Sequence, residues 1–195
     1  MKNALKVTAL LLCCVALVAC SQKGPAEAAL TAATAAVDAV KADAAKFVPD
    51  QAKSLMASLT SAREAFDKGD YKTALEAAQA IPAKAKDVGA AAVAKKEELT
   101  KAWASLASNV PAMVAQVKAK LDGYAAMKKL PKEMDKAKLA AAQTSLADIQ
   151  KATADAADTA KAGNFAEAVA KGNAVKAKVQ AMMTDLGLAA APAKV

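Results

Sequence analysis

Alanine is the residue that most constrains this chain: 58 of its 195 residues are alanine. Alanine has the highest helix propensity because its side chain loses no rotamer entropy when a helix forms. It also removes little apolar area from water when it is buried. The composition therefore predicts closely packed helices around a thin core, in which the few larger side chains supply most of the buried area.

No segment alternates apolar and polar residues with period two, so we expect no sheet. The fold class that we predict is all-α, an elongated antiparallel helical bundle built from two related helical units. The side chains expected to form most of its core are Leu55, Leu59, Phe66, Tyr71, Leu75, Ile81, Trp103, Leu106, Leu139, Leu146, Ile149, Phe165 and Val169.

Prolines, glycines and capping residues divide the chain into six predicted helices. Ser108 or Asn109 is expected to cap the fourth, with Pro111 in its first turn. Whether the third is continuous through Pro82 and Gly89 stays open. The predicted helices cover about 26–47, 51–69, 70–107, 109–123 (extending at most to 130), 132–163 and 164–188, followed by a flexible tail at 189–195.

The chain contains an internal repeat. Residues 69–75 match residues 163–169, and upstream Leu55 pairs with Ile149. In each copy a glycine is expected to end one helix in the left-handed conformation, and Asp70 or Asn164 to cap the next. The repeat predicts two helical units, residues 26–107 and residues 108–188.

The turn at Gly69-Asp70-Tyr71 resembles the hairpin of tetratricopeptide-like repeats. The resemblance covers about ten residues in each copy. The copies lie 94 residues apart, whereas that family repeats every 34 residues or so. We therefore interpret the turn as convergent, not as part of a tandem array.

The first twenty residues carry the clearest functional signal. Lys2 and Lys6 precede an apolar run at residues 7–18, which is too short to span a bilayer comfortably but typical of a signal peptide. The run ends in Leu17-Val18-Ala19-Cys20, which resembles the lipobox of bacterial lipoproteins. Alternatives are an ordinary signal peptide cleaved nearby, or a membrane helix.

The lipobox resemblance implies removal of residues 1–19 as a signal peptide and diacylglycerol on the Cys20 thiol. It also implies acylation of the new amino group, for example by palmitate. Two or three acyl chains give stable anchoring, whereas one chain binds a membrane only marginally. Residues 20–25 would then be a short lipidated tether. Ser21 follows the cysteine, and the sorting rule of such lipoproteins makes serine compatible with transfer to the outer membrane.

Charge points away from nucleic acid as a partner. The formal net charge is +8, and the only arginine is Arg63. Nucleic-acid binders generally use arginine for bidentate contacts and aromatic side chains for stacking, and this chain is poor in both. One lysine-rich stretch is a candidate contact for anionic lipid headgroups or cell-wall polymer, with Lys128, Lys129 and Lys132 as its proposed residues. The alternative is an ordinary solvated surface.

The residue types required for most catalysis are missing. The chain has no histidine, which is the commonest general base and metal ligand. Its cysteines are Cys13, Cys14 and Cys20, so the predicted mature chain has no pair for a disulfide or zinc site. Asp155 and Asp158 share a helix face, which we interpret as solvated surface. We expect no catalytic residues, no metal and no cofactor.

These patterns predict a non-enzymatic lipoprotein that is anchored to a membrane through Cys20 and faces the periplasm. Its expected role is scaffolding, envelope structure or contact with a protein partner in the cell envelope. The alternative is a binding module for an anionic ligand, such as cell-wall polymer or lipid headgroups, through the lysine-rich junction.

Overall fold

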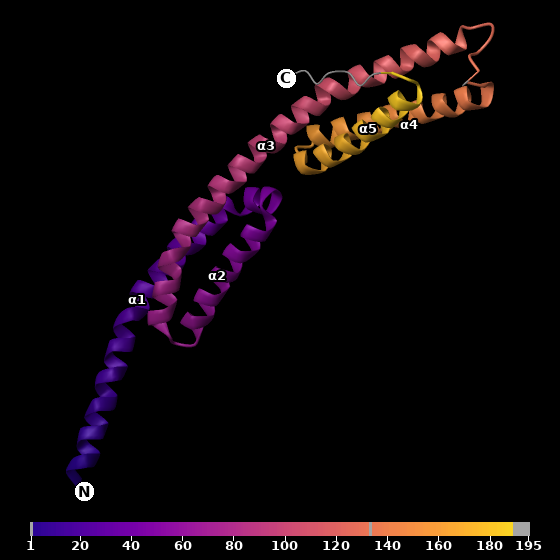
Figure 1. Ribbon diagram of the computed structural model, residues 1–195. Coiled ribbons are helices and arrows are strands. Elements are labelled where there is room, and N and C mark those ends of the chain that lie inside the picture. Colours follow the sequence, from indigo (N-terminus) through magenta and orange to yellow (C-terminus); the bar gives the residue numbers. More distant parts are fainter. Residues whose placement is uncertain (1, 133, 189–195) are drawn as a thin grey trace. The chain divides into compact units, whose positions relative to one another are not determined.

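The computed structural model describes residues 2–132 and 134–188, with side chains described from residue 22 onward (Figure 1). The prediction of an all-α fold is confirmed, because the described residues contain helices and no strand. The predicted tail at 189–195 lies outside the described residues. The helices are α1 (Lys2–Phe47), α2 (Pro49–Asp67), α3 (Tyr71–Ala125), α4 (Lys136–Lys161) and α5 (Phe165–Asp185).

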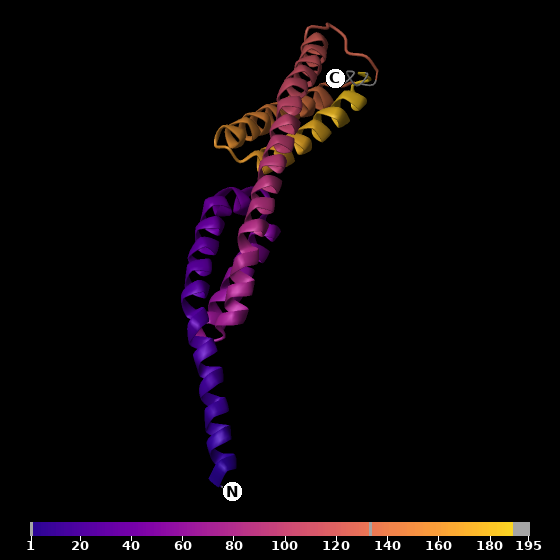
Figure 2. The same ribbon diagram turned by 90° about the vertical axis from the view of Figure 1, so that its left-hand side faces the viewer.

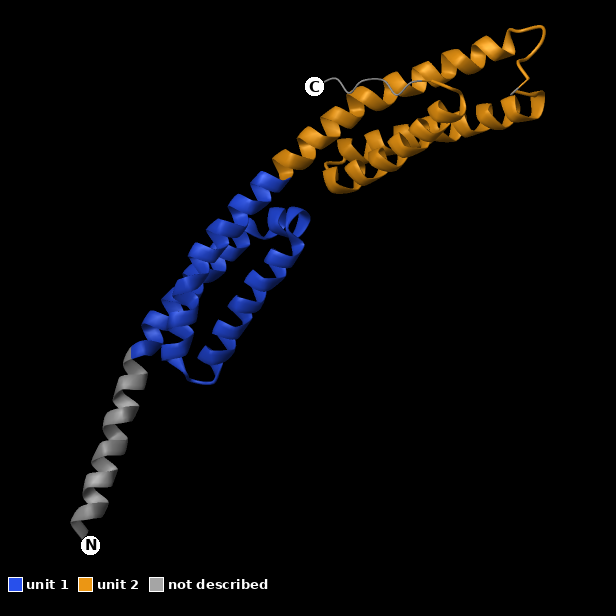
Figure 3. Ribbon diagram, viewed as in Figure 1, with its two compact units in different colours: residues 1–95 blue, residues 96–195 orange. Residues whose placement is uncertain are grey.

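The chain divides into two compact units, residues 1–95 and residues 96–195 (Figure 3). Unit 1 contains α1, α2 and the first part of α3. Unit 2 contains the rest of α3 together with α4 and α5. The division falls inside α3, after Lys95, whereas the repeat had suggested a boundary at residue 107.

The two units have cores of different composition. In unit 1, six of the eleven clustered buried residues are alanine, which is the thin, closely packed core that the composition predicts. In unit 2 the twelve clustered buried residues are all leucine, isoleucine, valine or methionine. The larger side chains are therefore concentrated in the second unit, around Val117 on α3, Ile149 on α4 and Val179 on α5.

Helix α3 is continuous where two predicted helices were expected to meet (Figure 2). The predicted start at Ser108 or Asn109 is wrong, and neither Pro82, Gly89 nor Pro111 ends the helix. The physical reason is a single buried stripe that continues across Pro111, so that tertiary packing outweighs the lost backbone hydrogen bond. The stripe consists of Leu106, Val110, Val114, Val117 and Leu121.

Two other helix starts differ from expectation. α1 does not begin at Ala26: residues 22–25 of the predicted tether are helical, with Pro25 inside the helix. α4 begins at Lys136, not directly after Pro131, because the Asp135 side chain caps it by accepting a hydrogen bond from the Lys138 backbone N–H at 2.7 Å. Both differences leave the all-α architecture unchanged.

The repeated turns have the predicted backbone. Gly69 and Gly163 have φ values of +80° and +75°, and each turn has the paired backbone hydrogen bonds of a Schellman motif. Asp70 accepts a hydrogen bond from the Thr73 backbone N–H at 3.2 Å, as a capping residue should. Asn164 occupies the N-cap position of α5, as predicted, but its side chain makes no capping hydrogen bond, and its carbonyl oxygen accepts from the Ala168 N–H.

Burial follows the repeat. Several pairs of residues at equivalent positions are buried in both copies, among them Leu55 and Ile149, Ala62 and Ala156, Ala74 and Ala168, and Ile81 and Val175. The aromatic side chains expected in the core are instead only half-buried. Tyr71 contacts Phe66 edge to face, with ring centroids 5.1 Å apart, and Trp103 packs against the margin of the unit 2 core. Apart from Phe47, the buried hydrophobic residues of the described chain are alanine, valine, leucine, isoleucine and methionine.

Candidate functional site

The predicted lipidation site is not described by the structure. The Cys20 side chain lies outside the described residues, as do the side chains of the predicted signal peptide. From residue 22 onward, the described helices contain no stretch that is long and apolar enough to cross a membrane. Cys20 therefore stays a prediction from the sequence.

The lysine-rich candidate lies on the segment that connects α3 to α4, residues 126–135, which we name the α3–α4 junction. Backbone hydrogen bonds hold both of its ends. The Met127 N–H donates to the Tyr124 carbonyl at 3.1 Å, and the Met134 N–H donates to the Pro131 carbonyl at 3.0 Å. The cap of α4 by Asp135 then fixes where the next helix begins.

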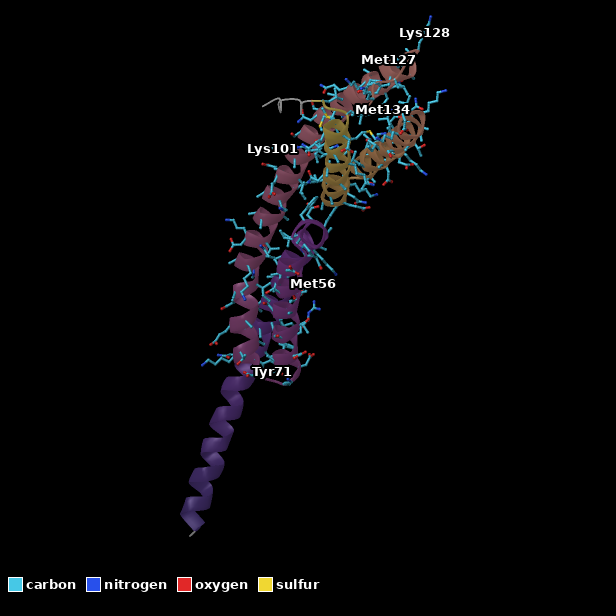
Figure 4. All side chains as sticks on the ribbon, turned by 45° about the vertical axis from the view of Figure 1, so that its right-hand side comes forward. Met56, Tyr71, Lys101, Met127, Lys128 and Met134 are labelled. Carbon is cyan, nitrogen blue, oxygen red and sulfur yellow. The ribbon has the colours of Figure 1, made fainter. Side chains whose placement is uncertain are left out.

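The structure brings the three predicted lysines together on this junction. Lys128, Lys129 and Lys132 are all exposed, and Figure 4 shows Lys128 projecting away from the ribbon. Lys136, at the first position of α4, is also exposed. Across the described part of the chain, no ion pair or hydrogen bond engages the ammonium groups of these four lysines.

Two other lysines of the same stretch are engaged elsewhere. The Lys118 Nζ lies 2.6 Å from the Asp122 carboxylate, four residues later on α3. The Lys120 ammonium lies over the ring of Tyr124, 5.1 Å from its centroid. Within this lysine-rich stretch, the exposed lysines that make no ion pair with a described residue therefore lie in the junction and in the first turn of α4.

An exposed apolar side chain lies among these lysines, and the sequence interpretation missed it. Met127 is 50% exposed, and it lines an open hollow of about 350 Å³ with Tyr124, Leu130, Met134 and Leu139. Lys128 and Lys136 also line this hollow. The sequence carried no clear signal for it, because Met134 of the same segment also lies beside charged residues and yet packs against the core of unit 2.

Comparison of the two repeats shows that the junction is an addition to unit 2. In unit 1, a single residue, Val48, separates α1 from α2, and it packs against the core of that unit. In unit 2, ten residues separate α3 from α4. The aliphatic–proline step is present in both copies, at Val48-Pro49 and at Leu130-Pro131. Reversing the chain between helices therefore does not require the longer, lysine-bearing segment.

The remaining surface features show no concentration of one charge. An open groove of about 730 Å³ between α4 and α5 is lined by Lys138 and Lys178 but also by Asp148 and Asp185. A small apolar hollow of about 90 Å³ lies beside Trp103. Among the described side chains, no cluster of acidic, cysteine or histidine residues could hold a metal ion.

The carboxylates that we interpreted as solvated are exposed and lie beside lysines. The Lys171 Nζ lies 2.9 Å from the Asp155 carboxylate and 3.0 Å from that of Glu167. The hydrogen bond to Asp155, followed by that to Glu167, raises the pKa of Lys171. Asp158 pairs with Lys161 at 2.9 Å. Asp155 and Asp158 therefore neutralise neighbouring lysines on the surface.

Comparisons with protein-family models, with curated proteins and with solved structures find no match for this chain.

Proposed function

We propose that the protein is a lipoprotein, anchored by lipid on Cys20 and facing the periplasm, that serves as a non-enzymatic scaffold of the cell envelope. The observation that carries the anchor is the tetrapeptide Leu17-Val18-Ala19-Cys20 at the end of an apolar run. Ser21 favours the outer membrane as its location.

The fold supports a scaffolding role. The chain presents repeated helical units, each with its own apolar core, and α3 is shared between them. Lysines and carboxylates on the helices, such as the Lys118–Asp122 pair, give these helices a charged outer surface. Helix faces of this kind are suited to contact with a protein partner, which would be held near the membrane by the anchor.

Crosslinking in intact cells, followed by capture of the full chain, tests the scaffolding role. We expect a protein partner of the envelope to be recovered with the parent chain. A Cys20→Ala variant, which should remain an unlipidated precursor, is the control and should lose this partner. Recovery of the same partner in equal yield with the Cys20→Ala variant would contradict a role that depends on the anchor.

A second candidate function is a binding module for an anionic ligand, cell-wall polymer or lipid headgroups. The observation that favours it is the group of exposed lysines, without an ion pair to any described residue, on a junction that unit 1 lacks. Sedimentation of the full chain with peptidoglycan tests its binding to cell-wall polymer. The variant changes Lys128, Lys129 and Lys132 to Gln, and the control changes Lys41, Lys53 and Lys86, three exposed lysines of unit 1, in the same way.

If the junction binds polymer, the variant of Lys128, Lys129 and Lys132 should lose binding and the control should keep it. Binding of the parent and of the control should weaken as salt rises, because salt screens the attraction. Equal losses in the two variants would mean attraction by net charge alone and would contradict a specific site.

A further inference from the structure

We propose that the α3–α4 junction docks on the surface of an anionic lipid bilayer. Lys128, Lys129, Lys132 and Lys136 contact the headgroup phosphates, and Met127 enters the acyl layer. This inference rests on the second candidate function, the anionic-ligand module, and names its partner.

The charge of the junction is complementary to that of an anionic bilayer surface. The segment from residue 126 to residue 136 has four lysines and two acidic residues, and one of these acids, Asp135, is turned toward the start of α4 as its cap. Each lysine near an anionic bilayer surface strengthens binding by about fivefold, because the surface potential acts on a single positive charge. Lysine suffices for this attraction, whereas bidentate recognition of one phosphate favours arginine.

The apolar component distinguishes a bilayer from a polymer. Met127 is half exposed at the start of the cationic segment, directly before Lys128, and it lines a hollow together with Tyr124 and Leu130. A hydrated polysaccharide offers no apolar layer for this side chain. A bilayer accepts both groups at once, since amphipathic surfaces bind membranes by apolar insertion together with attraction to anionic lipid.

The α3–α4 junction has no counterpart of similar length in unit 1. Unit 1 connects its equivalent helices with Val48 alone, which packs against a core. In unit 2 the inserted residues bring an exposed methionine and three exposed lysines, none of which belongs to the buried cluster of that unit. The insertion therefore adds an outward-facing amphipathic surface to a unit that does not need it for chain reversal.

Trypsin accessibility of the full chain tests the proposal. The protein is reconstituted into vesicles of phosphatidylcholine, with or without added phosphatidylglycerol. Cleavage after Lys128 and Lys129 is measured relative to cleavage after Lys68, the exposed lysine of the α2–α3 turn, in the same molecule. This internal reference removes any effect of the lipid on trypsin. We expect the ratio to fall at least tenfold in the anionic vesicles and to recover at high salt, because salt screens the attraction.

Matched variants separate the two components of docking. Met127→Ser should reduce the protection roughly fivefold by removing the apolar insertion, whereas Met56→Ser, at a methionine of α2 that is 42% exposed, should leave it unchanged. Lys132→Gln with Lys136→Gln keeps both cleavage sites and should remove most of the protection, because the loss of two lysines weakens binding by about 25-fold.

Equal ratios in neutral and anionic vesicles would overturn the proposal. Equal effects of Met127→Ser and Met56→Ser would also overturn it. Soluble peptidoglycan fragments added to neutral vesicles provide the polymer arm, and protection by them equal to that by anionic lipid would make the polymer the partner instead. Mass spectrometry of the same preparation reports on the anchor: protection without lipid on Cys20 would support this inference and contradict the proposed anchor.

Discussion

At the scale of single residues, two helical glycines have opposite surroundings. A Cβ atom at Gly172 on α5 would lie 3.0 Å from the Leu106 Cδ1 and 3.3 Å from the Trp103 ring, so a side chain here would overlap α3. A Cβ atom at Gly123, near the end of α3, would have nothing within 4 Å. Gly172 allows two helices to approach closely, whereas Gly123 only adds backbone entropy to the unfolded chain.

We therefore expect Gly172→Val to destabilise the protein by about 1–3 kcal/mol through overpacking. Gly123→Ala is the control and should stabilise it by about 0.5–1 kcal/mol, because alanine has the higher helix propensity. Urea unfolding followed by circular dichroism measures both. Equal free energies of unfolding for Gly172→Val and the parent would contradict the close approach of α5 to α3.

Asp70 and Asn164 occupy equivalent positions but differ as caps. The Thr73 side chain, followed by the Thr73 backbone N–H, lowers the pKa of Asp70 by hydrogen bonding to its carboxylate. A lowered pKa in the folded state means that the carboxylate stabilises the fold above its ordinary pKa of 3.8. This stabilisation is lost as the pH falls below that value through the folded pKa.

Asp70→Ala should therefore lower the free energy of unfolding at neutral pH, and the difference from the parent should shrink as the pH falls below 3.8. Asn164→Ala should have the smaller effect at neutral pH, since that side chain makes no capping bond. Urea unfolding across this pH range is the measurement. A difference for Asp70→Ala that does not change with pH would show that the carboxylate charge is irrelevant.

At the scale of helices, the continuity of α3 shows where tertiary packing outweighs local signals. Asn109 and Pro111 favour a helix start by their residue types. In the structure the Asn109 side-chain amide donates to the Ser105 hydroxyl at 3.3 Å, one turn back on the same helix. The buried stripe containing Val110 and Val114 holds the helix together on both sides of the proline.

If α3 is continuous, Pro111→Ala should stabilise the protein by about 1–3 kcal/mol, because alanine restores a backbone hydrogen bond and relieves the proline ring clash. Pro131→Ala, in the α3–α4 junction, is the control and should bring no such gain. Thermal unfolding reports the change as a higher Tm. A lower Tm for Pro111→Ala would contradict continuity and favour Pro111 as the first residue of a separate helix.

The glycine turns were predictable, whereas the starts of α1 and α4 were not. Gly69 and Gly163 could be predicted because few residues other than glycine adopt a positive φ. The start of α4 depends on Asp135 rather than on Pro131, because the Asp135 side chain caps the helix four residues after the proline. Lys128, Lys129 and Lys132 could be placed at a junction of two helices from the sequence. The exposure of Met127 could not be predicted, because Met134 of the same segment packs against the core of unit 2.

At the scale of the whole molecule, composition is an average over two different units. Alanine fills most of the clustered core of unit 1, where helices approach closely enough that a Cβ atom at Gly89 would lie 3.0 Å from Val40. Larger aliphatic side chains fill unit 2. The sequence predicts a thin core for the chain, but it does not show that the thin part is confined to one unit, because burial depends on which faces meet.

The anchor is the central claim, and it depends on one thiol. If Cys20 carries lipid, the folded helices are held at a membrane surface, and the proposed partners must be found there. The described side chains begin after this residue. The lipidation of Cys20 therefore has to be tested on the protein recovered from intact cells.

Metabolic labelling with radioactive palmitate, followed by capture of the full chain and of its Cys20→Ala variant, is the most direct measurement. We predict label on the parent chain, which should begin at Cys20 by mass spectrometry, and no label on the variant, which should retain residues 1–19. Absence of label from the parent, or an unlipidated mature chain that begins at another residue, would contradict the account.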